Sequence, residues 1–147
     1  MDELDQKIVK MLLDNSRISY VNMAKELGLS RVAIRERVKA LQNDGIIEDF
    51  TITLNLEKMG KKISAFFNIE VEPYYLESIA NELARDENVV SIYQMTGPST
   101  LHVHSVIKDM EALEQFIYKK LYSVKGITKV ENQVLLRRFK SRGGLRP

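Results

Sequence analysis

The chain has 147 residues, of which 44% are hydrophobic and 29% charged, a balance typical of a globular protein and not of a disordered one. It contains no cysteine, which excludes disulfides, thiolate metal ligands and cysteine nucleophiles. Its apolar runs are far shorter than the roughly 20 residues that a membrane span needs. The acidic residues 1–5 do not resemble a signal peptide. These features predict a cytoplasmic protein with no membrane partner.

Positive charge is concentrated in two segments of a chain whose formal net charge is only +2. Between residues 30 and 42, four cations stand against one acid, Glu36. From residue 137 to the end there are five cations and no acid. Local basic patches of this kind are typical of nucleic-acid contacts, although a solvated tail explains the second one equally well. The cations are Arg31, Arg35, Arg37 and Lys39 in the first segment, and Arg137, Arg138, Lys140, Arg142 and Arg146 in the second.

Three helices are predicted in the first 45 residues, because apolar residues recur there at spacings of three and four. Ser30 is suited to cap the third helix, and Gly28 to end the second in a left-handed conformation. The connection Gly28-Leu29-Ser30 has the length of the turn in a helix-turn-helix motif, which we place at about 20–39. The predicted helices are 2–14, 19–27 and 31–43.

The third predicted helix has an apolar inner side and a basic outer side, as a DNA recognition helix requires. A basic amphipathic helix alone is more often only a solvated face, but the turn and the two preceding helices favour DNA binding. We expect base-edge contacts from Arg31, Val32, Arg35 and Glu36 and phosphate contacts from Arg37 and Lys39. The candidate DNA-binding residues are Ser30, Arg31, Val32, Ala33, Arg35, Glu36, Arg37 and Lys39.

The remaining sequence predicts strands and helices in alternation. Residues 46–54 have a period of two, which indicates a two-stranded wing or one strand leading away. The order after residue 62 is βαββαβ, which predicts a ferredoxin-like unit. The predicted elements are strands 63–72, 89–96, 100–108 and 128–139 and helices 74–86 and 109–123. We therefore expect an α+β chain with a winged helix-turn-helix domain over 1–54, a linker over 55–62, a ferredoxin-like domain over 63–139 and a basic tail over 140–147.

The N-terminal part of the chain contains a series of short motifs. They are Leu4-Asp5 with Ile8, Asn15-Ser16-Arg17-Ile18-Ser19, Met23-Ala24, Leu27-Gly28-Leu29-Ser30, Arg37-Val38 with Leu41, and Gly45-Ile46-Ile47. These residues resemble those of the Lrp/AsnC family, the feast/famine regulators of transcription. The resemblance extends to about Phe139 and is weaker in the C-terminal half. It implies a sequence-specific regulator that binds pseudo-palindromic promoter DNA. It also implies a C-terminal domain that senses small molecules and forms homodimers through its sheets, with octamers or other rings of dimers in many members.

The resemblance implies that the turn between the second and third C-terminal strands, which we call the effector turn, helps to hold an effector, and many members of the family sense amino acids. In this chain the turn departs from the family pattern. Members often have Gly-Asp-Tyr-Asp there, whereas this chain has Gly97-Pro98-Ser99-Thr100. Without the acids, an ammonium group loses its charge-assisted acceptor, which argues for a different effector or none. His102 and His104 share one face of a predicted strand, where packing at an interface or effector pocket is favoured over a metal site. The candidate effector-binding residues are Gly97, Ser99, Thr100, His102 and His104, and no metal or cofactor is predicted.

Two alternatives to a specific regulator remain at this point. The sequence has no carboxylate dyad, phosphate-binding loop, Ser–His–Asp pattern or zinc motif, so an enzyme is not expected. Siroheme decarboxylase subunits nevertheless share the same two-domain plan and use histidines. A nucleoid-architectural protein would bind DNA with little sequence preference. The basic recognition helix favours the regulator.

Overall fold

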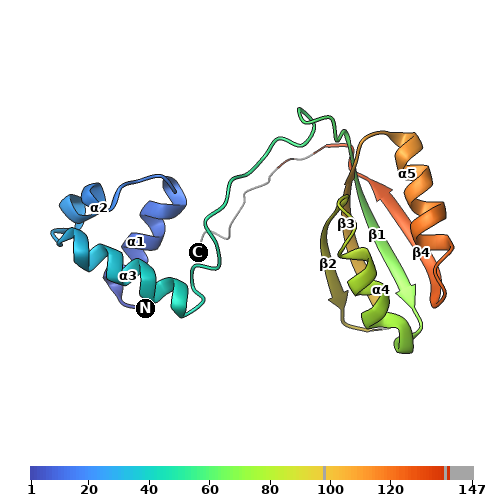
Figure 1. Cartoon of the computed structure of the whole chain (residues 1–147), viewed down its shortest axis with the longest axis horizontal. Coiled ribbons are helices and arrows are strands. Elements are labelled where there is room, and N and C mark those ends of the chain that lie inside the picture. The colour runs from blue at the N-terminus through green and yellow to red at the C-terminus, as the bar shows by residue number, and fades with distance from the viewer. Residues whose placement is uncertain (98, 138, 140–147) are drawn as a thin grey trace. The chain divides into compact units, whose positions relative to one another are not determined.

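The computed structural model describes residues 1–97, 99–137 and 139 and divides the chain into two compact units between Thr53 and Leu54 (Figure 1). Each unit has its own hydrophobic core. The tail predicted over 140–147 lies outside the described residues, as do Pro98 and Arg138. None of the described helices is long and apolar enough to cross a lipid bilayer.

The N-terminal unit consists of helices whose ends are fixed by capping residues. The Asp2 carboxylate accepts a hydrogen bond from the Asp5 N–H at 2.8 Å, and the Asp5 carboxylate accepts one from the Asp2 N–H at 2.9 Å, which closes a capping box. Gly28 ends the second helix with a φ of 65°, a conformation that glycine adopts at little cost. The helices lie within one residue of their predicted bounds. They are α1 (Glu3–Asp14), α2 (Tyr20–Leu27) and α3 (Arg31–Asn43).

The core of this unit lies where the three helices meet. Ile34, Val38 and Leu41 form an inner stripe on α3 and are buried. Each fully buried aliphatic side chain contributes about 1.5–3 kcal/mol. Because the stripe follows the helical repeat, its packing fixes the rotation of α3 about its own axis. The buried residues that meet it from α1 and α2 are Ile8, Leu12, Met23 and Ala24.

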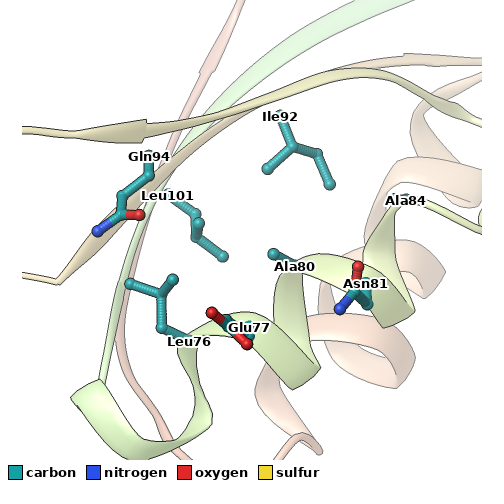
Figure 2. A pocket seen from close by; sticks show the side chains of 8 residues that line it. All are labelled: Leu76, Glu77, Ala80, Asn81, Ala84, Ile92, Gln94 and Leu101. Atoms are coloured by element: carbon teal, nitrogen blue, oxygen red, sulfur yellow. The ribbon is translucent and has the colours of Figure 1, made fainter.

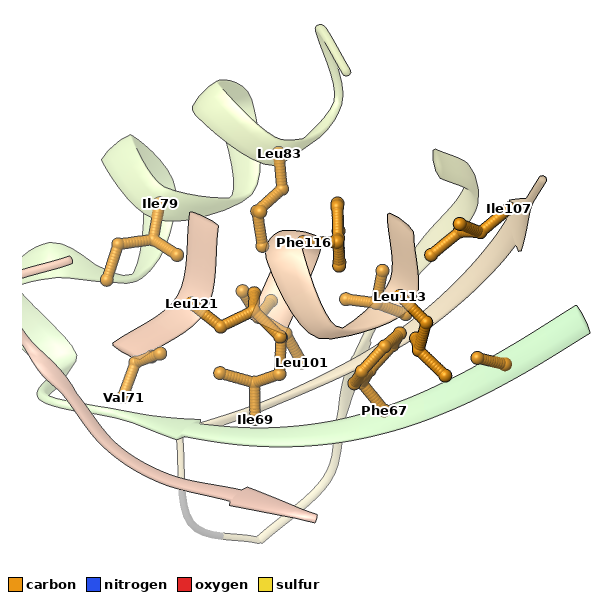
Figure 3. Packing of buried hydrophobic residues seen from close by; sticks show 12 residues of the cluster. Phe67, Ile69, Val71, Ile79, Leu83, Leu101, Ile107, Leu113, Phe116 and Leu121 are labelled. Carbon is orange, nitrogen blue, oxygen red and sulfur yellow. The ribbon is translucent and has the colours of Figure 1, made fainter. Parts of the chain in front are cut away.

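The described residues of the C-terminal unit form a four-stranded antiparallel sheet in the order β2-β3-β1-β4. Leu101 and Ile107 of β3 and Phe67 of β1 are buried against α4 and α5, which cover one face of the sheet (Figure 3). This arrangement confirms the predicted ferredoxin-like topology. The elements are β1 (Ile63–Val71), the 3₁₀ turn η1 (Pro73–Tyr75), α4 (Leu76–Leu83), β2 (Val89–Met95), β3 (Thr100–Ile107), α5 (Met110–Phe116), the π-helical segment η2 (Ile117–Tyr122) and β4 (Ile127–Val134).

The structure has no strand over 46–54, where one was predicted, and this segment has no regular secondary structure. The first residues of the segment instead form hydrogen bonds with the last turn of α3. The N–H groups of Ile46 and Ile47 both donate to the carbonyl of Leu41, at 2.9 and 3.0 Å. Farther along, Ile52 is 77% exposed, so no packed face selects an extended conformation. A strand also needs a hydrogen-bonding neighbour, and the described residues of the N-terminal unit contain none.

The last strand ends at Val134, not at Phe139 as predicted. Val134 pairs with Ala65, and the N–H of Leu135 still donates to the Ser64 carbonyl at 2.8 Å. β1 begins at Ile63, so it offers no further backbone groups to which residues beyond Leu135 could hydrogen-bond.

A contact between a glycine and a tyrosine closes the loop that precedes β4. Gly126 has a φ of 96°, and its carbonyl accepts the Glu72 N–H at 2.7 Å. A Cβ atom on residue 126 would lie 2.5 Å from Cδ2 of Tyr75. The Lys125 ammonium lies 5.7 Å from the centroid of the same ring. Both the backbone conformation and the approach of the ring therefore require glycine at this position.

The hydroxyl of Ser105 on β3 is fully buried and has no hydrogen-bond partner in the described part of the chain. Burying an unpartnered hydroxyl costs about 1–3 kcal/mol. We expect Ser105→Ala to raise the free energy of unfolding by about 1 kcal/mol, measured by urea denaturation followed by circular dichroism. Ser64→Ala is the matched control and should lower stability, because Ser64 Oγ lies 2.7 Å from His104 Nε2. A less stable Ser105→Ala variant would show that the Ser105 hydroxyl is bonded in solution.

Candidate nucleic-acid interface

The outer face of α3 is exposed within the N-terminal unit and is mainly cationic. Val32 is 60% exposed, and the side chains of Arg31 next to it and of Lys39, two turns farther along, are exposed as well. This face lies opposite the inner stripe, whose burial prevents the helix from turning it inward. An exposed helix face with cationic donors around an apolar centre is suited to the major groove of duplex DNA.

Ser30 and Ala33 shape the start of this face. Ser30 Oγ accepts the Ala33 N–H at 3.0 Å and so caps the helix. The other N–H groups of the first turn lack acceptors within the helix and carry the positive end of its dipole, so this end is suited to a phosphate. Ala33 is half-buried, which leaves Val32 as the better contact for a thymine methyl group.

Arg35 and Glu36 form an ion pair on the outer face. Glu36 Oε1 accepts hydrogen bonds from Arg35 Nε at 3.0 Å and from Arg35 Nη2 at 2.8 Å. The two side chains are 63% and 55% exposed. The sequence placed both residues on the face but did not indicate this contact, because neighbouring residues on a helix do not normally face each other.

Arg37, for which the sequence predicts a phosphate contact, is bound in the structure to two carboxylates at the start of α1. Its Nη1 donates to Asp2 Oδ2 and to Asp5 Oδ1, both at 2.7 Å, and its side chain is only 31% exposed. The contact ties α3 to the first turn of α1. Both bonds use Nη1 and contribute to the stability of the unit, while the phosphate contact of Arg37 stays a prediction.

The same contact shifts two pKa values. The backbone N–H of Asp5 and the guanidinium of Arg37 lower the pKa of the Asp2 carboxyl from its ordinary value. Hydrogen bonds to Asp2 and Asp5 raise the pKa of Arg37. Asp2 and Arg37 are therefore both favoured in their charged forms in the folded unit.

The candidate effector residues on β3 lie on the open face of the sheet, which we define as the face opposite α4 and α5. The ring of Phe66 stacks on both imidazoles, with centroid distances of 4.4 Å to His104 and 5.9 Å to His102. His102 Nδ1 lies 2.8 Å from the amide oxygen of Asn68. Thr100 follows on the same face, at the end of β3. The open face thus has a half-buried aromatic centre with polar partners.

The predicted effector turn is fixed to the neighbouring strand through its backbone. Gly97 has a φ of 108°, and the Ser99 carbonyl accepts the Val71 N–H at 2.8 Å. Pro98, between them, lies outside the described residues. No group of three or more potential metal ligands occurs among the residues that the structure describes.

Charge on the open face is concentrated at β4. Lys129 Nζ lies 2.8 Å from Glu131 Oε1 and 3.5 Å from Glu70 Oε1. The hydrogen bond to Glu131 is the main reason that the pKa of Lys129 is raised. This end of the open face is therefore polar, in contrast to the aromatic centre.

A hollow of about 410 Å³ lies on the other face of the sheet, between α4 and β2 (Figure 2). Ala80 and Ile92 contribute to its apolar floor, and Glu77, Asn81 and Gln94 bring polar groups to its rim. None of the predicted effector residues lines it. The sequence could not indicate the hollow, because its lining comes from segments that show only ordinary helix and strand patterns. The remaining lining residues are Leu76, Ala84 and Leu101.

Two family models match the chain. One, described as a winged helix-turn-helix DNA-binding domain, covers residues 1–48, and the other, described as the Lrp/AsnC ligand binding domain, covers residues 64–145. The fold and the exposed face of α3 define the class, which is a helix-turn-helix transcription regulator with a ligand-binding domain. The chain belongs to the Lrp/AsnC family.

Relatives and solved structures agree with this assignment. The chain is 33% identical over 147 residues to an HTH-type transcriptional regulator of Pyrococcus furiosus, covering 100% of this chain and 99% of that one. It is 31% identical over 140 residues to the HTH-type transcriptional regulator Ptr1 of Methanocaldococcus jannaschii, covering 95% of each chain. The structure of AsnC from E. coli has a TM-score of 0.89 at 24% identity and covers 97% of each chain. A Neisseria meningitidis transcriptional regulator in complex with L-Met has a TM-score of 0.91 at 24% identity, covering 99% of this chain and 96% of that one.

The contrast between Arg37 and Arg31 gives a testable prediction. Arg37→Gln should lower the melting temperature of the N-terminal unit by several degrees, because it removes the contact between α1 and α3. Arg31→Gln, on the exposed face, should leave melting unchanged and weaken DNA binding. Circular dichroism and fluorescence anisotropy with duplex DNA measure the two effects.

The pH dependence of melting tests the same contact. The lowered pKa of Asp2 means that its contribution is complete above the ordinary value of 3.8 and is lost as the pH falls through the folded-state value. The melting temperatures of wild type and Arg37→Gln should therefore converge in acid. Equal melting of the two proteins at neutral pH would contradict the role assigned to Arg37.

Proposed function

We propose that the chain is a sequence-specific DNA-binding regulator of transcription that reads promoter DNA with the outer face of α3. The observation that carries the proposal is that Arg31, Arg35 and Lys39 stand on an exposed face whose opposite side is locked into the core. Family membership and the names of the relatives support it. The proposal assigns the chain no catalytic step.

Selection of duplexes from a random pool by the purified protein tests the proposal. The enriched duplex should bind about 1,000-fold more tightly than a scrambled duplex at the same salt concentration. Lys39→Ala should weaken binding to both duplexes and reduce the slope of log affinity against log salt by about 1, as expected for a phosphate contact. Equal affinity for both duplexes would instead favour the nucleoid-architectural alternative. Absence of binding at low salt would exclude both functions.

We also propose that the chain forms a homodimer through the open face. Tyr93, Phe66, His102 and His104 give this face an aromatic centre that no element of the C-terminal unit covers among the described residues. A second copy of the same face is a suitable partner, since its apolar centre would be buried while the charged groups at β4 stay near the rim. The operator would then have two half-sites related by the dimer axis.

Two tyrosines of equal exposure test the dimer. Tyr93 on the open face and Tyr118 on η2 are both 60% exposed. Tyr93→Glu should weaken self-association at least tenfold, because it places a charge in the proposed interface, whereas Tyr118→Glu should leave it unchanged. Light scattering across a concentration series measures the effect. A wild-type monomer at micromolar concentration, or equal behaviour of the two variants, would contradict the proposed interface.

We further propose that a small molecule, of the amino-acid class or another, modulates DNA binding through Gly97, Ser99, Thr100, His102 and His104. The match to the Lrp/AsnC ligand binding domain supports a ligand in this half of the chain. Pro98 and Thr100 occupy the sequence positions where a carboxylate pair is common in the family. The hydroxyl and imidazole groups nearby would therefore supply the polar contacts to a ligand. The duplex selection, repeated with an amino-acid mixture present, shows whether the affinity or the chosen sequence responds.

A further inference from the structure

The ion pair on the outer face of α3 has a geometry that points to a base. A guanidinium offers five N–H donors in one plane. In Arg35 the edge that carries Nε is occupied, because Nε and Nη2 both donate to Glu36 Oε1, at 3.0 and 2.8 Å. The end of the plane that carries Nη1 and Nη2 stays directed away from Glu36. Two parallel N–H groups at that end match the O6 and N7 acceptors that guanine presents in the major groove.

The position of the pair on the helix strengthens this interpretation. At 3.6 residues per turn, Val32, Glu36 and Lys39 follow one another along the middle of the outer face, and Arg35 stands to one side of that line. The bonds to Glu36 therefore hold the guanidinium toward the middle of the face. An unrestrained arginine would lose rotamer freedom on binding, and a restrained one has less to lose.

The charge of Glu36 also requires an explanation. A carboxylate in the middle of a DNA-facing surface is repelled by the phosphates, so it weakens binding to DNA of any sequence. The presence of Glu36 is explained if this residue helps the protein to discriminate between DNA sequences, even though it lowers the affinity for DNA in general. We infer that Glu36 is a positioning residue that holds the Arg35 guanidinium for bidentate recognition of one guanine in each half-site. This inference rests on the proposed function.

The experiment uses the duplex enriched by the wild-type chain and measures affinity by fluorescence anisotropy at fixed salt. Each guanine is replaced in turn by 7-deazaguanine, which lacks the N7 acceptor. Wild type should lose about tenfold in affinity at one guanine per half-site, and Arg35→Ala should be insensitive to that replacement. Glu36→Gln should lose most of the preference for this guanine while binding scrambled duplex as well as wild type or better.

Glu26→Gln is the matched control, because it removes one exposed carboxylate from α2 and has no partner in the recognition helix among the described residues. It should change affinity for enriched and scrambled duplex by the same factor. If Glu36→Gln keeps the full guanine preference, or if no guanine responds to the replacement in wild type, the positioning role is wrong. The positioning role is also wrong if Glu36→Gln loses discrimination only at a cytosine. In that case Glu36 would itself accept a hydrogen bond from the cytosine amino group. If wild type enriches no sequence at all, the proposed function itself fails, which separates the two outcomes.

Discussion

The burial of the inner stripe of α3 is the constraint on which the DNA-facing half of the molecule depends. Ile34, Val38 and Leu41 can leave water only if the helix holds one rotation about its axis. That rotation presents Val32 and Glu36 outward with the cations around them. A polar substitution in the stripe would therefore affect more than stability, because the same packing that holds the helix also sets the angle at which every outer side chain meets a groove.

The two faces of the C-terminal sheet differ, because one is covered by helices and the other is not. Leu101, Val103 and Ile107 of β3 are buried under the helices, whereas His102 and His104 alternate with them on the open face. A strand of alternating residues can thus contribute to the core with one side and to an uncovered face with the other. The open face is also only partly polar. Its aromatic centre resembles the middle of a protein interface and its charged end resembles a rim.

The sequence was most informative where local rules decide the structure. The cap at Ser30 and the turn at Gly28 depend only on neighbouring residues, and the helix bounds next to them followed from these local signals. The ion pairs of Arg37 could not be predicted, because its carboxylate partners lie 32 and 35 residues away in the chain and only the fold brings them together. The prediction of a strand over 46–54 was wrong. A period of two shows that apolar and polar side chains alternate, but it does not show whether a neighbouring strand is present to pair with. The pair formed by Arg35 and Glu36 depends on a choice of rotamer that no periodicity encodes.

The contact between Gly126 and Tyr75 links two positions that are far apart in the chain. Any side chain at 126 would collide with the ring, and a φ of 96° would strain it even in open space. Substitutions at the two sites should therefore be correlated. A larger residue at 126 needs both a smaller residue at 75 and a different backbone conformation in the turn. Among functional relatives, the pair should change together or remain as it is.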